Sequence, residues 1–176
     1  MDFTSKETAC HILQPLAYNL IRKIRKPNKR VRSAYEQYTI HCTAYEFESN
    51  VLKIPKPLFY DGPNAYVMDQ FEDMYPLPEP YFFHFPQLVA ALVSFRQHMI
   101  SNGCWPRDFS IFCINDRQFM LIDFGRFGYV DSNRVKFPHE NTLYTLEEAS
   151  LFYGLQIYDE YDFIPSPPQS PKCVAS

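Results

Sequence analysis

The hydrophobic and polar positions divide the chain into a strand-like first part and a more helical remainder. Short apolar stretches over residues 8–24, interrupted by Pro15, predict two or three strands of a small sheet. From Ser33 to about Asn50, aromatic and apolar positions recur every three or four residues, which is the period of a helix. Ser33 is followed three residues later by Glu36, as in a capping box, so the helix is predicted to begin there.

The middle of the chain predicts a hairpin and a longer helix. Leu58–Tyr60 and Ala65–Met68 flank an Asp-Gly turn, which is typical of two paired strands. An apolar stripe of helical period runs over residues 88–99, with Pro86 placed to occupy the first turn. This helix is expected to end near Asn102-Gly103.

The remaining patterns predict the fold class and the domain limits. A shorter helix is expected from Thr145 to about Leu155, and the Ser- and Pro-rich residues 166–172 are typical of disorder. Strands early and helices later indicate an α+β fold. We divide it into a sheet-rich part at 1–68, a second part at 69–161 and a disordered tail at 162–176.

Composition narrows the class of protein. The 176 residues are 46% hydrophobic and 17% aromatic, which favours a folded domain with a real core over a disordered chain. The five cysteines lie at irregular spacings without a CxxC pair, so free thiols are favoured over a zinc site or a disulfide framework. The start does not resemble a signal peptide, and no apolar run approaches about 20 residues. We therefore expect no membrane association and an intracellular protein, cytoplasmic or nuclear or both.

Charge is distributed unevenly along the chain. The net charge is only −3, yet the segment from Arg22 to Arg32 holds seven of the 17 basic residues. This run could contact phosphates of RNA, although an ordinary solvated face is the commoner explanation. RNA contact through Arg22–Arg32 is kept as a weaker hypothesis.

The most informative motif is Leu121-Ile122-Asp123-Phe124-Gly125. An apolar strand ends there in an Asp, and Asp108 stands fifteen residues upstream in Pro106-Arg107-Asp108. Phosphoryl transfer from ATP uses two carboxylates at about this separation, one for the acceptor hydroxyl and one for the metal on the phosphates. Asp108 is therefore the candidate catalytic residue, and Asp123 is the candidate ligand for Mg²⁺.

Together with the order of the elements, these residues resemble the protein-kinase-like fold, specifically its reduced atypical branch. That branch holds the RIO kinases and the small kinase of the KEOPS tRNA-modification complex. The resemblance runs from about Leu20 to Gly125. It implies two lobes, a small β-rich N-lobe and a reduced helical C-lobe, with ATP and Mg²⁺ as cofactors.

The resemblance also implies roles for residues outside the motif. Lys23 sits where such kinases place the strand lysine that contacts the phosphates, and Glu46 where the next helix supplies its partner glutamate. Residues 54–62 and 65–68 are similar to the strands that lead to a hinge at 68–72. Met68, Asp69 and Gln70 of that hinge would then hold the adenine ring.

Several assignments have rivals, and the chain departs from the family pattern in three places. Lys26 competes with Lys23, and Glu36 and Glu48 compete with Glu46. No glycine precedes Gly62, Pro106 replaces the usual His, and Cys113 replaces the Asn expected five residues after Asp108. A thiol is a poor ligand for Mg²⁺, and a shifted register would make Asn115 the ligand instead.

Three classes of function remain open. The first is a kinase or ATPase that binds ATP and Mg²⁺ and transfers phosphate to a Ser or Thr of a protein substrate. The second is a pseudokinase that binds a regulatory protein partner with little or no transfer. The third is an RNA-associated protein. A small-molecule kinase of the aminoglycoside-phosphotransferase type shares the fold but usually carries a larger C-terminal part.

Overall fold

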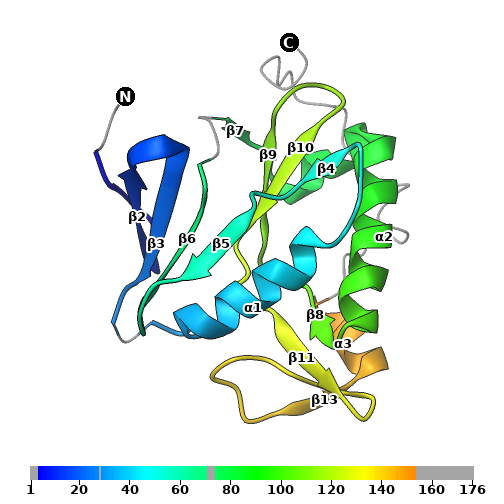
Figure 1. Ribbon diagram of the computed structural model, residues 1–176. Coiled ribbons are helices and arrows are strands. Elements are labelled where there is room, and N and C mark those ends of the chain that lie inside the picture. The colour runs from blue at the N-terminus through cyan, green and yellow to red at the C-terminus, as the bar shows by residue number, and fades with distance from the viewer. Residues whose placement is uncertain (1–3, 28, 71–73, 154–176) are drawn as a thin grey trace.

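The computed structural model describes residues 4–27, 29–70 and 74–153, which form three sheets and three α-helices (Figure 1). The predicted α+β class is confirmed, because helices pack beside mainly antiparallel sheets. The predicted tail at 162–176 and residues 71–72 of the predicted hinge lie outside the described residues.

The N-terminal sheet confirms the first strands and the hairpin predicted from the sequence. Its five strands are all antiparallel, in the order β1 (Lys6–Glu7), β2 (His11–Leu16), β3 (Leu20–Arg25), β6 (Ala65–Asp69) and β5 (Pro57–Tyr60). Tyr18 and Asn19 close the β2–β3 turn with positive φ, and Gly62 at φ +81° serves the β5–β6 turn. The long, regular β2–β3–β6 pairing makes this sheet a firm platform for β3 and its lysine.

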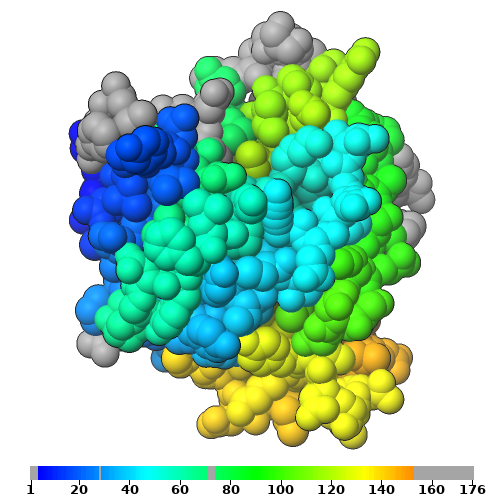
Figure 2. Space-filling view, in the orientation of Figure 1, coloured from blue at the N-terminus to red at the C-terminus, as the bar shows by residue number. Residues whose placement is uncertain are grey.

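Helix α1 (Ala34–Tyr45) packs against β5 and β6. Ser33 Oγ accepts the backbone N–H of Glu36 at 3.2 Å, which confirms the predicted cap. The helix ends at Tyr45, earlier than predicted, and Ser49 Oγ accepts the N–H groups of Val51 and Leu52 in the turn that follows. In the space-filling view, α1 lies between the N-terminal strands, α2 and the β11–β13 region (Figure 2).

The second sheet and α2 form the main hydrophobic core. The strands are ordered β4 (Leu52–Lys53), β10 (Phe119–Ile122), β9 (Ser110–Cys113) and β7 (Tyr75–Pro76), and β4 runs parallel to β10. Against them lie the 3₁₀-helix η2 (Glu79–His84) and α2 (Pro86–Ser101), whose Leu92 and Phe95 are buried with Phe119. The predicted apolar stripe of α2 is thus confirmed as its core-facing side.

A third, antiparallel sheet corrects the prediction of a mainly helical second part. Its strands are β8 (Cys104–Trp105), β11 (Gly128–Asp131), β12 (Arg134–Lys136) and β13 (Leu143–Thr145), with α3 (Leu146–Tyr153) packed on β12 and β13. These strands have two to four residues each, too few for a period of two to be recognised in the sequence. Thr145 Oγ1 accepts the N–H of Glu148 and caps α3 where that helix was predicted to begin.

Two further predictions are refined by the contacts. The division at residue 68 stays a prediction, but β4 belongs to the first segment and pairs with β10 of the second, so the two parts interlock.

Cys10, Cys42 and Cys104 are free, as expected, whereas Cys113 takes part in a disulfide. Among the described residues, no helix combines the length and the hydrophobicity that crossing a bilayer would require.

Candidate functional site

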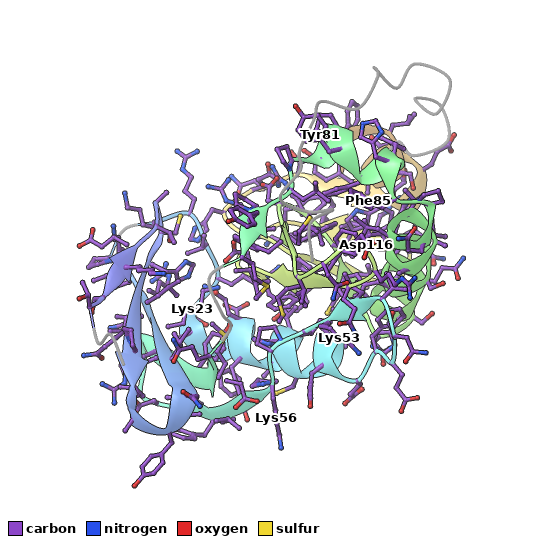
Figure 3. The ribbon with its side chains drawn as sticks, turned by 90° about the horizontal axis from the view of Figure 1, so that it is seen from above. Lys23, Lys53, Lys56, Tyr81, Phe85 and Asp116 are labelled. Carbon is purple, nitrogen blue, oxygen red and sulfur yellow. The ribbon has the colours of Figure 1, made fainter. Side chains whose placement is uncertain are left out.

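The central feature is an ion pair between Lys23 and Asp123, which lie 100 positions apart in the sequence. Lys23 Nζ lies 3.2 Å from Asp123 Oδ1. Lys23 comes from β3, at the boundary between the N-terminal sheet and the rest of the chain (Figure 3). Its side chain is 4% exposed, whereas that of Asp123 is 39% exposed. The lysine is therefore held inside the protein while the carboxylate still reaches a cavity.

Both oxygens of the Asp123 carboxylate accept hydrogen bonds. Oδ1 accepts from Lys23, and Oδ2 accepts the hydroxyl of Ser110 at 2.9 Å. Burial favours a higher pKa for Asp123, but the charge of Lys23 and the two hydrogen bonds outweigh it and lower the pKa. Burial would lower the pKa of Lys23, but Tyr66 and Asp123 raise it. The pair is therefore charged at neutral pH.

Two neutral histidines surround this pair. His41 of α1 donates from Nε2 to the carbonyl of Pro55 at 2.6 Å, so its Nδ1 accepts the hydroxyl of Tyr66 at 3.0 Å. The Nε2 of His11 lies 2.9 Å from the amide nitrogen of Gln37. Burial, reinforced by the charge of Lys23, lowers the pKa of each histidine to about 3. The spacing of residues 11 and 41 carries no ligand pattern, so the sequence offered no signal for this arrangement.

A cavity of about 510 Å³ opens beside the ion pair. Its polar wall includes Lys23 and Asp123, and its apolar wall includes Leu13, Met68 and Phe112. Small-molecule sites typically have volumes of about 300–1,000 Å³ and combine apolar walls with a few placed polar groups. The cavity therefore has the size and chemistry of a ligand site.

Glu46 does not take the position predicted for it. It lies exposed at the C-terminal cap of α1, and its side chain forms no ion pair with a described residue. Its rival Glu36 pairs instead with Arg32 at 2.7 Å. The helical period turns Gln37 and His41, four residues apart, towards the interior, so α1 presents neutral groups where a carboxylate was expected. The predicted Lys23–Glu46 pair is thus wrong, and Asp123 is the partner of Lys23.

The contacts of the two candidate lysines distinguish Lys23 from its rival Lys26. Lys26, the rival of Lys23, pairs with Glu7 at 2.9 Å and does not line the cavity. The basic run as a whole is also dispersed, since Lys23 and Arg32 are buried and Arg22 pairs with Asp61 at 2.7 Å. These three of the seven basic side chains are thus engaged within the protein, Lys29 and Arg30 are exposed, and RNA contact through this run stays a prediction.

Asp108 lies near Asp123 in sequence but lines a different cavity. That cavity, of about 470 Å³, adjoins the first, and Ser110 lines both. The Asp108 side chain is 54% exposed and lies 3.6 Å from Arg107 Nε and 3.9 Å from Arg126. With φ +53°, its backbone adopts a left-handed conformation that is uncommon outside glycine.

Ser110, and not Cys113 or Asn115, is the residue after Asp108 that contacts the Asp123 carboxylate. The loop from β8 to β9 contains only residues 106–109, so β9 begins two residues after Asp108. Cys113 is consequently buried within β9, and Asn115 accepts backbone N–H groups in the following turn. The short loop brings Ser110 to Asp123, which register counting from the family pattern could not reveal.

The three residues predicted to bind adenine, Met68, Asp69 and Gln70, differ in whether they line the cavity. Met68 is buried in β6 and lines the cavity, as the prediction requires. The backbone N–H of Asp69 donates to Lys56 and that of Gln70 donates to Asn19, each at 2.8 Å. These two amides are therefore engaged within the protein, and of the described residues of the predicted hinge Met68 is the one that lines the cavity.

The described residues contain no group of three or more His, Cys, Asp or Glu side chains that could hold a metal ion. The Asp123 carboxylate and the Ser110 hydroxyl bonded to it are hard oxygen donors beside Lys23. A scan against protein-family models, a search of curated proteins and a search of solved structures each found no match to this chain. The function of the site is therefore inferred from its geometry.

Proposed function

We propose that the chain is an atypical kinase-like module with two lobes that binds ATP in the cavity beside Lys23 and Asp123. The observation that carries this proposal is the buried lysine, 3.2 Å from a carboxylate that follows a core strand, at the wall of a cavity of about 510 Å³. A buried, fixed cation is the group that a polyphosphate requires. The N-terminal sheet followed by α1, and later the β9–β10 hairpin ending at Asp123, support the kinase-like arrangement.

The residues present fit a nucleotide better than they fit a dedicated metal cage. Lys23 would contact phosphate oxygens, and Leu13 and Met68 would contact the base. Asp123, assisted by the Ser110 hydroxyl, would hold Mg²⁺, which proteins often bind through one or two carboxylates and the substrate phosphates. When bound, the ion would neutralise phosphate charge.

We favour a regulatory, pseudokinase-type role, in which nucleotide binding serves the recognition of a protein partner. Two features support this choice. Helix α1 supplies no carboxylate to Lys23, and the loop that carries Asp108 has only four residues between β8 and β9. Both features leave fewer side chains that could orient an acceptor hydroxyl or serve as a second metal ligand.

Phosphate transfer to a protein Ser or Thr is the second candidate. It is favoured by one observation: Asp108 lies two residues from Ser110, and Ser110 lines both the cavity of Asp123 and that of Asp108. A hydroxyl entering from the second cavity would approach the nucleotide site at this shared wall. Asp108 would then be the residue that accepts its proton.

The proposal is tested by isothermal titration calorimetry with ATP, with and without Mg²⁺. Wild-type protein is expected to bind ATP, and Lys23→Met to weaken binding by about tenfold or more, because the phosphates lose their cation. Lys26→Met removes the same kind of charge outside the cavity and should bind as wild type does. Absence of ATP binding to folded wild-type protein, or equal binding by Lys23→Met, would refute the proposal.

Transfer is measured with radiolabelled ATP and a generic protein acceptor. For a pseudokinase, wild type and Asp123→Ala give the same background incorporation. Incorporation that exceeds this background and is lost in Asp108→Asn would establish the second candidate instead. Because Asp108 is exposed, the Asp108→Asn variant should keep the fold and the ATP affinity.

A further inference from the structure

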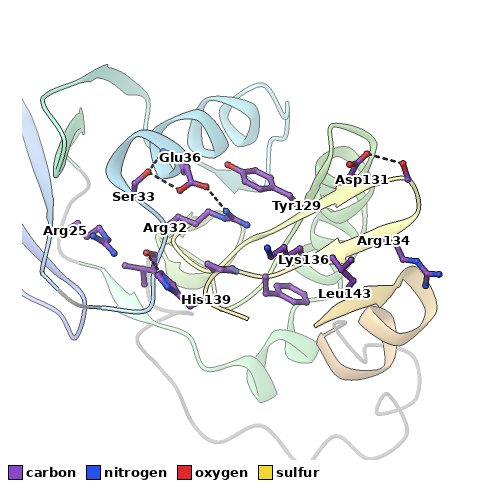
Figure 4. A pocket seen from close by; sticks show the side chains of 14 residues that line it. Arg25, Arg32, Ser33, Glu36, Tyr129, Asp131, Arg134, Lys136, His139 and Leu143 are labelled. Atoms are coloured by element: carbon purple, nitrogen blue, oxygen red, sulfur yellow. Dashed lines mark hydrogen bonds and ion pairs between the residues drawn. The ribbon is translucent and has the colours of Figure 1, made fainter. Parts of the chain in front are cut away.

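A third cavity lies apart from the nucleotide site, between the N-terminal end of α1 and the sheet that contains β11 and β12. It has a volume of about 800 Å³ and shares no lining residue with the cavity beside Lys23. Figure 4 shows Arg32, Tyr129 and Lys136 projecting into it from different segments. We call this cavity the basic groove.

The basic groove carries excess positive charge on a protein that is negative overall. Four Arg and Lys side chains line it against two carboxylates, Glu36 and Asp131, so its formal charge is +2, whereas the chain carries −3. Two of these groups are committed to the fold. Arg32 pairs with Glu36 at 2.7 Å, donates to the carbonyl of Phe127 at 2.7 Å and stacks 3.7 Å above the ring of Tyr129.

Two of the remaining cations are available to a ligand. Arg134 and Lys136 are exposed on β12 on either side of the fully buried Val135, so both project from the same face of the strand. The side chain of neither forms a hydrogen bond or an ion pair with a described residue. At the other end of the basic groove, Arg25 donates from Nη2 to the carbonyl of Lys29 at 3.1 Å, while its buried Nε has no hydrogen-bond partner among the described residues. A buried donor of this kind is stabilised when an acceptor reaches it.

The basic groove also has an apolar wall. Leu143 is 59% exposed at its rim, and Phe137 and Pro138 line it nearby. A ligand that uses the whole basic groove therefore needs both anionic and apolar groups. Nucleic acid fits this combination less well, because its affinity depends on many phosphate contacts and the two carboxylates would repel them.

We propose that the basic groove binds an extended acidic segment of a partner protein, with carboxylates at alternate positions and apolar residues between them. In an extended chain, side chains two residues apart project to the same side at about 6.6–6.8 Å, which is also the spacing of Arg134 and Lys136 along β12. The carboxylates would pair with these two cations, and an apolar neighbour would contact Leu143.

The test is fluorescence anisotropy with a labelled eight-residue peptide of alternating Glu and Leu. Arg134→Ala/Lys136→Ala should weaken binding by about tenfold or more, since the two proposed ion pairs are lost. Lys53→Ala/Lys56→Ala removes two positive charges outside the basic groove and should leave the affinity unchanged within about twofold. Replacing Glu by Gln in the peptide should weaken its binding to wild type. The affinity should fall to about that of the Arg134→Ala/Lys136→Ala variant for the Glu peptide.

A charge exchange makes the test independent of simple loss of stability. Arg134→Glu/Lys136→Glu should reject the Glu-Leu peptide and bind its Lys-Leu counterpart. The proposal is overturned if wild type does not bind the Glu-Leu peptide, or if both double-alanine variants bind it equally. It is also overturned if an oligouridine RNA binds more tightly than the peptide and depends more strongly on Arg134 and Lys136.

Discussion

His11 and His41 remain uncharged although they lie close to a lysine and an aspartate. Their burial and the positive charge of Lys23 keep both pKa values near 3. The partners of their ring nitrogens are neutral: the amide of Gln37 for His11, and the hydroxyl of Tyr66 and the carbonyl of Pro55 for His41. The Lys23–Asp123 pair is therefore balanced within itself at neutral pH. A second positive charge beside Lys23 would attract anions more strongly but would destabilise the empty protein.

These histidines predict that stability falls as the pH drops from about 6.5 towards 3. In the unfolded chain each has its ordinary pKa of 6.5, so below that pH the unfolded state binds protons that the folded state excludes. For His41 alone, the loss is about 2 kcal/mol at pH 5. Urea unfolding between pH 7 and pH 5 should show a shallower pH dependence for His41→Gln than for wild type.

The control for this prediction is His139→Gln, which changes an exposed histidine. It should retain the wild-type pH dependence. A slope in His41→Gln as steep as that of wild type would mean that His41 is charged in the folded protein.

At the scale of elements, the β11–β12 pairing depends on one close approach. A Cβ added to Gly128 of β11 would lie 2.9 Å from Phe137 Cε1 and 3.0 Å from Val135 Cγ1, two buried side chains that cluster with Trp105 and Ala149. Real Cβ atoms essentially never lie closer than 3.0 Å to a neighbour, so a side chain at this position would force a shift. Glycine at position 128 therefore lets β11 lie close to the buried side chains of this cluster.

We expect Gly128→Ala to lower the free energy of unfolding by about 1–3 kcal/mol, the usual effect of overpacking a core. Gly62→Asn is the matched control, because a Cβ at Gly62 meets nothing within 4 Å and Asn tolerates its positive φ of +81°. Thermal unfolding of both variants should show a clear decrease only for Gly128→Ala. An unchanged melting temperature there would show that β11 shifts freely.

At the scale of the whole molecule, the Lys23–Asp123 pair joins the N-terminal sheet to the segment after β10. Its two members differ in exposure, 4% for Lys23 and 39% for Asp123. Removing the carboxylate leaves a buried ammonium without its anion, whereas replacing Lys23 by Met leaves a carboxylate that Ser110 and solvent can still stabilise. The two substitutions should therefore be unequal.

Asp123→Asn removes the charge and tolerates the positive φ of +75° at this position, and it is expected to lower the free energy of unfolding by about 2 kcal/mol. Lys23→Met should lower it less, and Asp108→Asn, at an exposed carboxylate with φ +53°, should have little effect. Urea unfolding at pH 7 without nucleotide provides the measurement. A larger loss in Lys23→Met than in Asp123→Asn would mean that the lone carboxylate, and not the lone ammonium, is the costlier charge to leave unpaired.

The sequence by itself determined the features that depend on near neighbours. The cap of α1 at Ser33, the apolar stripe of α2, the β5–β6 hairpin and the strand ending at Asp123 all arise from residues a few positions apart. Their signals are periodicity and turn chemistry, which a linear pattern contains. The α+β class followed from these elements.

Only the tertiary structure decided which side chains meet. The pairing of Lys23 with Asp123, the contact of Ser110 with the same carboxylate and the burial of His11 and His41 join segments that no local pattern relates. The short strands of the third sheet, and with them the basic groove, likewise form only when distant segments pair. The physical reason is that burial and pairing are set by packing across the whole chain, whereas local propensity acts over a few residues.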